Sequence, residues 1–241
     1  SMTQRVCRQI RTVEPEANIT ITTGVQQKSA IINQLGQDID ICIEPMRRDT
    51  FPAIALAIVY LKEKRNLSRE SAVIVGPVDP YTDNQYFCKF HDLEEAVITG
   101  DNNLVLMGIS PTYPSEKYGY ILPELGAGKV RKVRSFKEKP CLEDAKTLIS
   151  QGAMWNSGVF AFKIGYILDI LSEYVDDIAY DYLYEHYHEL PKLSFDYAVV
   201  EKEKNIGCIS FQGEWKDVGT WNTLAEEMSS SALGNVLLVE N

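Results

Sequence analysis

Two aspartates that follow buried-looking segments are the residues in this chain best suited to chemistry. Asp79 ends the run VGPVD, and Asp217 lies within the run WKDVGTW. Carboxylates at the carboxyl ends of strands can hold a hard cation through oxygen, so the pair predicts a divalent metal site that faces a phosphate. The structural alternatives are a turn aspartate beside prolines for Asp79 and a helix N-terminal aspartate for Asp217.

A second group of polar residues follows strand-like segments further along the chain. Glu138 and Lys139 lie in FKEKP, where a fixed Lys and Glu could hold a sugar phosphate and its hydroxyls. Alternation would place Lys137 and Lys139 on one face of a strand and Glu138 on the other, unless Pro140 disturbs the pleat. The alternative is a solvated charge run.

Three further motifs combine polar or aromatic residues with positions that suit ligand contact. EPMRRDT lies between a strand and a helix N-terminus, where backbone N–H groups suit an anion or a base edge, although Asp49 or Thr50 could simply cap the helix. KYGY and WNSG each place an aromatic residue near a glycine, which permits close backbone approach to a ligand. A bulge or a tight turn is the alternative for both.

The elements that must position these residues alternate between strand and helix in the first half of the chain. Apolar patterning predicts strands at 19–22, 40–43, 72–76 and 104–109, and helices at 2–13, 29–35, 50–61 and from Thr82 to Gly100. This order predicts a mainly parallel sheet in a three-layer α/β sandwich. Antiparallel strands are expected at 118–122 and 130–136, further strands at 159–162 and 206–211, and helices at 142–149, 164–188, 195–202 and 223–228.

Composition limits the classes of function. The 241 residues are 45% hydrophobic and carry a formal charge of −10, which argues against a nucleic-acid groove or an anionic membrane surface. Five cysteines without a CxxC pair disfavour disulfides and structural zinc and favour the cytoplasm. The HYH run at His186 to His188 places its histidines on different helix faces, and no Ser/His/Asp arrangement stands out. A homodimer is left open, because the sequence does not fix the oligomeric state.

The order and spacing of seven motifs resemble the sugar-nucleotide pyrophosphorylases, and among them the mannose-1-phosphate guanylyltransferases. The motifs are EPMRRDTFPAIALA, VGPVDP, YGYI, FKEKP, WNSGVFAFK, FDYAVVEK and WKDVGTW, and the resemblance runs from Ser1 to about Met228. It implies an α/β fold of the Rossmann-like nucleotidyltransferase type, a three-layer αβα sandwich with a mixed central sheet.

The resemblance also implies a reaction in which GTP and mannose 1-phosphate give GDP-mannose and pyrophosphate, with Mg²⁺ as the cofactor. Two alternatives remain: the same chemistry with another sugar phosphate or nucleoside triphosphate, or a non-catalytic regulatory homologue that binds nucleotide sugars. Retention of both Asp79 and Asp217 favours the enzyme, because a protein that only binds has less need of the metal pair.

The roles of individual residues follow from the same resemblance. Asp79 and Asp217 would hold Mg²⁺, and Lys139 would act with them in catalysis. The residues expected to bind substrate are Glu138 at the sugar phosphate, Gly119, Tyr120, Asn156 and Gly158 around the hexose, Glu44, Arg48 and Thr50 near the base and ribose, and Asp196 and Lys202 within FDYAVVEK.

The chain departs from the family pattern in three places. Pro80 stands where the family usually has His, and the segment from Met46 to Asp49 differs from the usual small residue, Arg and Asn. The opening strand and glycine-rich loop that cradle the triphosphate are not seen, so we expect that they are omitted or that another segment fills their slot. We expect one nucleotidyltransferase domain at 1–228, followed at 229–241 by a linker and the start of a C-terminal β region.

Overall fold

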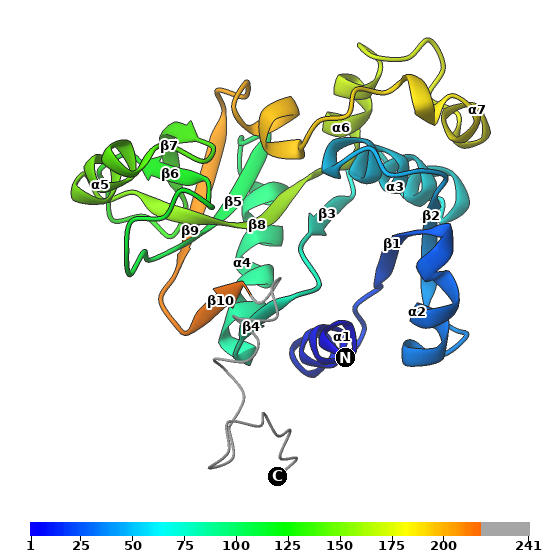
Figure 1. Ribbon diagram of the computed structural model, residues 1–241, viewed down its shortest axis with the longest axis horizontal. Coiled ribbons are helices and arrows are strands. Elements are labelled where there is room, and N and C mark those ends of the chain that lie inside the picture. The colour runs from blue at the N-terminus through cyan, green and yellow to red at the C-terminus, as the bar shows by residue number, and fades with distance from the viewer. Residues whose placement is uncertain (218–241) are drawn as a thin grey trace.

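The structure is a computed structural model that describes residues 1–217, and ten strands within this range form three sheets (Figure 1). The strands are β1 (Thr20–Gly24), β2 (Asp40–Glu44), β3 (Ala72–Val75), β4 (Pro80–Thr82), β5 (Leu104–Ile109), β6 (Tyr120–Pro123), β7 (Arg131–Lys137), β8 (Met154–Lys163), β9 (Ile206–Phe211) and β10 (Trp215–Asp217).

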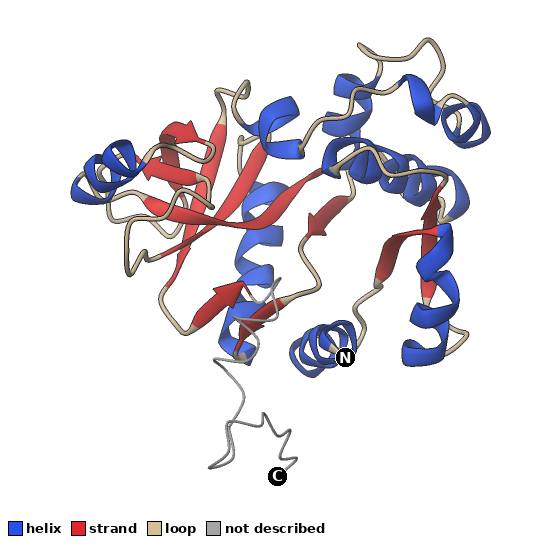
Figure 2. Cartoon of the chain, in the orientation of Figure 1, coloured by secondary structure: helices blue, strands red, loops and turns tan. Residues whose placement is uncertain are grey.

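Seven α-helices and three shorter helical turns connect these strands within the described residues (Figure 2). The α-helices are α1 (Met2–Val13), α2 (Lys28–Leu35), α3 (Thr50–Lys64), α4 (Asn84–Thr99), α5 (Leu142–Ser150), α6 (Ile164–Leu171) and α7 (Tyr180–Glu185). The shorter turns are a 3₁₀ turn at Val25–Gln27, a second at Tyr187–Glu189, and a π-helix at Asp196–Val200. No helix in this part of the chain combines the length and apolar character needed to cross a bilayer.

The central sheet has six strands in the order β3-β8-β5-β9-β7-β6 and is mixed. Strands β5 and β9 are parallel, whereas β8 lies between β3 and β5 and is antiparallel to both. The mixed sheet is confirmed, but the expectation of a mainly parallel sheet is wrong. The apolar run at 159–162 predicted a strand without its direction or neighbours, because both depend on contacts with distant parts of the chain.

Alternate residues along the strands pack into two separate hydrophobic clusters, one on each face of the sheet. On strand β5, Leu104 and Leu106 face the cluster that contains residues of α3 and α6. Val105 and Met107 face the cluster that contains residues of α4. Because successive side chains of a strand point to opposite faces, this division confirms a three-layer arrangement of helix, sheet and helix.

Strands β1 and β2 form a separate parallel pair beside the central sheet (Figure 1). Within residues 1–217, β1 pairs with β2 alone and β3 pairs with β8 alone, so each has one edge without a partner strand. The expectation of an omitted opening strand stays a prediction. The predicted helix at 223–228 and the predicted linker at 229–241 lie outside the described residues.

Two helix predictions need correction. The expected helix at 164–188 is divided into α6, which ends at Leu171, and α7; in the connecting segment the Asp177 side chain accepts a hydrogen bond from the Ala179 N–H at 2.9 Å. The helix α4 is capped by Asp83, whose Oδ1 accepts the N–H groups of Gln85 and Tyr86. Thr82, where the sequence predicted the helix to begin, belongs to β4 instead.

The residue that precedes α3 has a strained backbone. Asp49 has φ 71° and ψ −176°, a combination that side-chain-bearing residues rarely adopt, and its Oδ1 accepts the Thr50 N–H at 2.8 Å. Such strain costs on the order of 1–3 kcal/mol, and it persists only where neighbouring contacts fix the backbone. The loop that leads into α3 is therefore held in one conformation.

This strain predicts an order of stability for two substitutions at Asp49. Both Asp49→Gly and Asp49→Ala remove the hydrogen bond to Thr50, but only glycine relieves the strain. The glycine variant loses about 0.4–1 kcal/mol of folding free energy, because its unfolded chain has more conformational freedom. The strain that glycine relieves is larger, so we expect Asp49→Gly to be more stable than Asp49→Ala by about 1 kcal/mol. Urea unfolding measures the difference, and a more stable alanine variant would contradict it.

Candidate functional site

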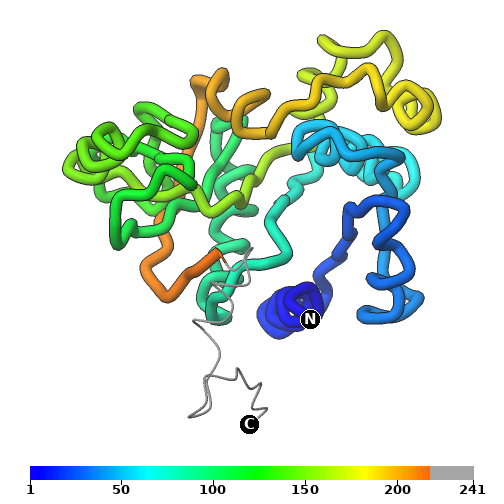
Figure 3. Tube along the Cα trace, viewed as in Figure 1, coloured from blue at the N-terminus to red at the C-terminus, as the bar shows by residue number. Residues whose placement is uncertain are grey.

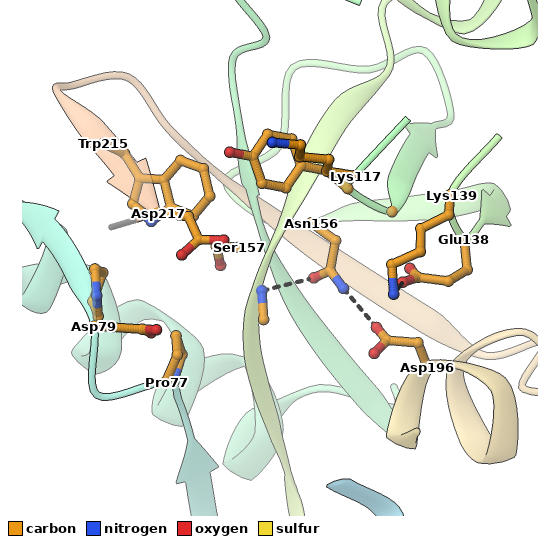
Figure 4. Close-up of a pocket in the computed structure, with 14 residues that line it drawn as sticks. Pro77, Asp79, Lys117, Glu138, Lys139, Asn156, Ser157, Asp196, Trp215 and Asp217 are labelled. Atoms are coloured by element: carbon orange, nitrogen blue, oxygen red, sulfur yellow. Dashed lines mark hydrogen bonds and ion pairs between the residues drawn. The ribbon is translucent and has the colours of Figure 1, made fainter. Parts of the chain in front are cut away.

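A cavity of about 230 Å³ opens where loops from several strands meet, and most of the predicted site residues line it (Figure 4). Among the predicted residues, the structure brings together Asp79, Gly119, Glu138, Lys139, Asn156, Gly158, Asp196 and Asp217. These residues come from segments that are up to 138 positions apart in the chain (217 − 79). The fold therefore gathers the two aspartates and the polar group at Glu138 in one place.

The two aspartates are brought together by a two-stranded antiparallel ribbon. Strand β10 pairs with β4 so that Asp217 lies opposite Pro80, which places it next to Asp79 in the register. The Thr82 hydroxyl donates a hydrogen bond to the Glu214 carbonyl at 2.8 Å and closes the other end of the ribbon. Pairing of β4 with β10 thus converts two distant sequence positions into one carboxylate pair.

Helix α1 also contacts this ribbon. The side chains of Arg5 and Gln9 both donate to the Thr82 carbonyl, each at 2.9 Å, and the Arg5 guanidinium lies 4.1 Å from the centre of the Tyr81 ring. A cation that close to an aromatic face is attracted to it. The ribbon that carries the aspartates is therefore fixed to the body of the protein on one side.

Burial and mutual repulsion disfavour a negative charge on Asp79. Its pKa is raised above the ordinary value, first by burial and then by the nearby charge of Asp217. Among the described residues, no group of three or more His, Cys, Asp or Glu side chains is placed to hold a metal ion. Two carboxylates nevertheless fit Mg²⁺, because this ion often uses one or two protein carboxylates and completes its shell with water and substrate phosphates.

The opposite part of the cavity holds a lysine among carboxylates. The Lys139 Nζ lies 3.3 Å from the Glu138 Oε1, and the Glu138 side chain is almost fully buried. Strand β7 ends at Lys137, and Lys139 has φ 43°, so the chain has turned out of the strand before the lysine. The strand alternation that was predicted to place Lys137 and Lys139 on one face therefore stops at the end of the strand. Lys139 lines the cavity and Lys137 does not.

Asp196 begins the π-helix and faces this lysine and glutamate (Figure 4). Burial raises its pKa to about 7, and the nearby charge of Glu138 contributes in the same direction. Lys139 and the hydrogen bond from Asn156 act against this shift. Asp196 is therefore divided between its protonated and ionised forms near neutral pH.

Asn156 connects the segments that line the cavity. Its backbone N–H donates to the Gly119 carbonyl at 2.7 Å, its Nδ2 donates to Asp196 Oδ1 at 2.8 Å, and its Oδ1 accepts the Gly158 N–H at 3.2 Å. An amide has two donor hydrogens and two acceptor lone pairs, so one of each is left for a ligand. A hydroxyl-rich ligand could use both.

Glycine is required at two of the lining positions. A Cβ on Gly119 would lie 2.5 Å from Glu138 Oε2 and 2.8 Å from the Phe136 ring. Gly158 has φ 74°, a left-handed conformation that favours glycine. Gly119 therefore permits the close approach of Glu138 and Phe136, whereas Gly158 permits a left-handed backbone. The close approach of a ligand to these glycines, expected from KYGY and WNSG, stays a prediction.

Five predicted residues do not line the cavity. Tyr120 is fully buried, and its hydroxyl donates to the Ser115 carbonyl while it accepts from the Ser115 N–H and from Trp155 Nε1. Lys202 is exposed and donates to the Tyr174 hydroxyl at 3.4 Å. These contacts give Tyr120 and Lys202 structural partners away from the cavity.

The other three are Glu44, Arg48 and Thr50, which were predicted to lie near a base and ribose. Each makes a hydrogen bond to the segment from Tyr187 to Phe195. Their contact with a nucleotide stays a prediction.

Several lining residues were not singled out as site residues from the sequence. They are Pro77, Pro80, Lys117, Tyr118, Ser157 and Trp215. A signal was present for Trp215, because it precedes Asp217 by two positions and a strand places such residues on the same face. Tyr118 packs against Trp155 and Trp215 with ring centres 4.9 and 5.6 Å apart, so one wall of the cavity is aromatic.

The site combines two chemical capacities. One end offers paired carboxylates to a cation, and the other offers Lys139 with hydrogen-bonding groups on Glu138, Asn156 and Asp196. A ligand with hydroxyls and phosphate would meet both. Because described residues supply no cysteine or histidine to the cavity lining, the arrangement suits positioning and charge neutralisation better than attack by such a side chain.

Comparisons with known proteins identify the family of the chain. The model of the nucleotidyl transferase family matches residues 2–232. A mannose-1-phosphate guanylyltransferase of Escherichia coli is 33% identical over 224 residues, which cover 83% of this chain and 48% of the relative. One from Sinorhizobium fredii (strain NBRC 101917 / NGR234) is 30% identical over 215 residues, with coverages of 82% and 42%.

A solved structure described as mannose-1-phosphate geranyltransferase from Thermus thermophilus superposes with a TM-score of 0.81 at 26% identity. The match covers 93% of this chain and 68% of that structure. The chain spans about half the length of the two relatives described above.

The raised pKa of Asp79 predicts that its replacement by asparagine stabilises the metal-free protein at neutral pH. Since the folded state disfavours the charge, Asp79 lowers stability as the pH rises through its folded pKa. We expect Asp79→Asn to resist urea better than wild type at pH 7 with a chelator present, and to lose this advantage as the pH falls below 3.8, the ordinary value. A less stable variant at pH 7 would refute the repulsion argument.

Proposed function

The chain belongs to the nucleotidyl transferase family, and on that premise we propose that it transfers a guanylyl group from GTP to mannose 1-phosphate. The products are GDP-mannose and pyrophosphate. The observation that supports the proposal most is the cavity that places the pair Asp79 and Asp217 opposite Lys139 and Glu138. Guanylyltransferases among the relatives support the choice of GTP and mannose 1-phosphate.

The reaction is a displacement at phosphorus. A phosphate oxygen of the sugar phosphate attacks the α-phosphorus of GTP, and the bond from that phosphorus to the bridging oxygen breaks. Pyrophosphate leaves with the electron pair of the broken bond. Such a transfer needs alignment of the reactants and neutralisation of charge more than a covalent intermediate.

Asp79 and Asp217 would hold Mg²⁺ at the α-phosphate. When bound there, the ion would neutralise charge that builds on the phosphate oxygens. The ribbon of β4 and β10 keeps the two carboxylates in register, and the hydrogen bonds from α1 to Thr82 restrain the ribbon. The protein thus supplies a fixed oxygen pair rather than a complete metal cage.

Lys139 and its neighbours would bind the sugar phosphate. Lys139 offers its ammonium group to the phosphate, while Glu138 restrains that group at 3.3 Å. Asn156 and Asp196 lie at the same end of the cavity and can pair with hexose hydroxyls. This division places the sugar at the Lys139 end and the reacting phosphates between the two ends.

An assay of the intact protein tests the proposal against its alternatives. The protein is incubated with Mg²⁺, mannose 1-phosphate and each nucleoside triphosphate in turn, and released pyrophosphate is measured. We expect the fastest release with GTP. Preference for another triphosphate or hexose phosphate would change the substrates, whereas GDP-mannose binding without pyrophosphate release would favour a regulatory protein.

We also propose a cytoplasmic location, since all five cysteines are free thiols and three of them, Cys7, Cys42 and Cys208, are buried. Free thiols of this kind are usual in a reducing compartment. The net charge of −10 agrees with small-molecule substrates rather than a nucleic-acid or membrane partner. A homodimer remains open to measurement by light scattering.

The metal role predicts that Asp217→Asn loses turnover. Removal of one carboxylate from a two-carboxylate site should lower kcat/KM by at least about 100-fold, while the circular dichroism spectrum is unchanged. Asp144→Asn, on the exposed surface of α5, is the matched control and should keep wild-type activity. Full activity of Asp217→Asn at ordinary Mg²⁺ concentrations would exclude the metal role.

The sugar-phosphate role predicts a different change for Lys139→Met. Loss of a charge-assisted hydrogen bond costs on the order of 1.5–3 kcal/mol, so KM for mannose 1-phosphate should rise by roughly tenfold or more. KM for GTP should change little. Lys146→Met, which removes an exposed lysine of α5, is the control, and an equal rise of both KM values for Lys139→Met would argue against this assignment.

A further inference from the structure

The segment that the sequence assigned to a base and ribose is tied to another part of the chain. The Tyr187 hydroxyl donates to Glu44 Oε2 at 3.1 Å, Arg48 Nε donates to the Leu190 carbonyl at 2.6 Å, and the Phe195 N–H donates to Thr50 Oγ1 at 2.8 Å. We call the residues from Tyr187 to Phe195 the tethered segment. Figure 3 shows this yellow and orange part of the tube running along the blue and cyan part that leads into α3.

The tethered segment is held along its whole length. A fourth hydrogen bond runs from the Phe51 N–H to the Leu193 carbonyl at 3.2 Å. Along the tethered segment it lies between the bonds at Leu190 and Phe195. Tyr187, Leu190 and Phe195 are fully buried. Because hydrogen bonds recur at 187, 190, 193 and 195, the segment cannot shift without breaking several of them together.

The next residue after the tethered segment is Asp196, which lies in the cavity. The Phe195 ring packs on Phe160 and Phe162 of β8, with ring centres 4.7 and 5.8 Å apart. Asp196 in turn accepts the hydrogen bond from Asn156 of the same strand. The position of Phe195 therefore sets where the Asp196 carboxyl meets the amide of Asn156.

We propose that Glu44, Arg48 and Thr50 are positioning residues for the sugar end of the cavity, acting through the tethered segment on Asp196 and Asn156. The inference rests on the proposed function, because it assigns the hexose phosphate to that end. Thr50 is the nearest of the three in this chain of contacts, since its hydroxyl accepts the N–H of the residue that precedes Asp196. Each of these side chains makes a hydrogen bond within the protein: Glu44 with the Tyr187 hydroxyl, and Arg48 and Thr50 with backbone groups of the tethered segment.

The physical reason is the cost of an unpaired backbone donor. Replacement of Thr50 by valine keeps the shape of the side chain but removes the acceptor for the Phe195 N–H. A buried donor without a partner costs about 1–3 kcal/mol, so the backbone at Phe195 should move to recover a hydrogen bond. That movement displaces Asp196 and loosens the amide of Asn156, both of which face the sugar.

The test compares Thr50→Val, Thr50→Ser and the control Thr147→Val. Thr147 lies on exposed α5, and its hydroxyl also makes one hydrogen bond to backbone, at 3.0 Å to the Glu143 carbonyl. For Thr50→Val we expect KM for mannose 1-phosphate to rise about tenfold and KM for GTP to stay within about twofold of wild type. Thr50→Ser restores the hydroxyl and should restore KM, and Thr147→Val should match wild type.

A rise of KM for GTP alone would overturn the proposal and restore Thr50 as a nucleotide contact. Equal rises of both KM values, or no change in either, would also overturn it. Tyr187→Phe is the second variant, because it breaks the bond to Glu44 without touching the loop before α3. It should give the same split if the tethered segment positions Asp196, and it keeps the test decisive if Thr50→Val does not fold.

Direct binding separates this proposal from the proposed function. Isothermal titration calorimetry follows the binding of each hexose 1-phosphate without turnover. A wild-type protein that binds such a phosphate but makes no GDP-mannose refutes the proposed function, and the affinity of Thr50→Val still judges the positioning role. A wild-type protein that binds no hexose 1-phosphate overturns both.

Discussion

The site depends on one physical conflict, the repulsion between two carboxylates that the fold holds side by side. The pairing of β4 with β10 brings Asp217 next to Asp79, and burial raises the pKa of Asp79 further. This arrangement opposes folding, and among the contacts that offset it are the Thr82 hydroxyl, which closes the ribbon, and α1, which holds the Thr82 carbonyl. A loss of folding stability of this kind is expected at a functional site, where charged groups are held close together for binding or catalysis.

Strand β8 connects this conflict to the rest of the cavity. It lies antiparallel between β3 and β5, so its early residues reach the end of the sheet from which the chain leaves β3 towards Asp79. Asn156 and Gly158 therefore meet the loop that carries Asp79, while the same asparagine bonds to Asp196 on the other side. One strand thus carries the polar groups between the carboxylate pair and the Lys139 end, which would allow a single cavity to serve both reactants of the proposed reaction.

The sequence predicted the parts that depend on local pattern and missed those that depend on distant pairing. Apolar runs located the strand at 104–109, and the motifs VGPVD and WKDVGTW pointed to Asp79 and Asp217, which both line the cavity. The direction of β8 could not be predicted from its own residues, because neighbouring strands set it. The division of the helix at 164–188 was missed although the hydrogen bond between Asp177 and Ala179 that precedes α7 is local. Tyr120 was assigned to the hexose from its motif, yet its side chain points into the core, where Trp155 and Ser115 satisfy its hydroxyl.

The charge balance of the cavity constrains how anionic substrates can enter. Four carboxylates and two lysines line it, and Lys139 is already paired with Glu138, within a chain of net charge −10. A triphosphate that approached without a cation would meet mostly negative charge, and Coulomb repulsion at these short distances is several kcal/mol even with an effective dielectric of about 20. If the nucleotide of the proposed reaction entered together with its cation, the cation would lower this barrier and would also offset the repulsion at Asp79. On the proposed function, the same excess of carboxylates that disfavours the empty site would make binding of an anionic substrate depend on the cation.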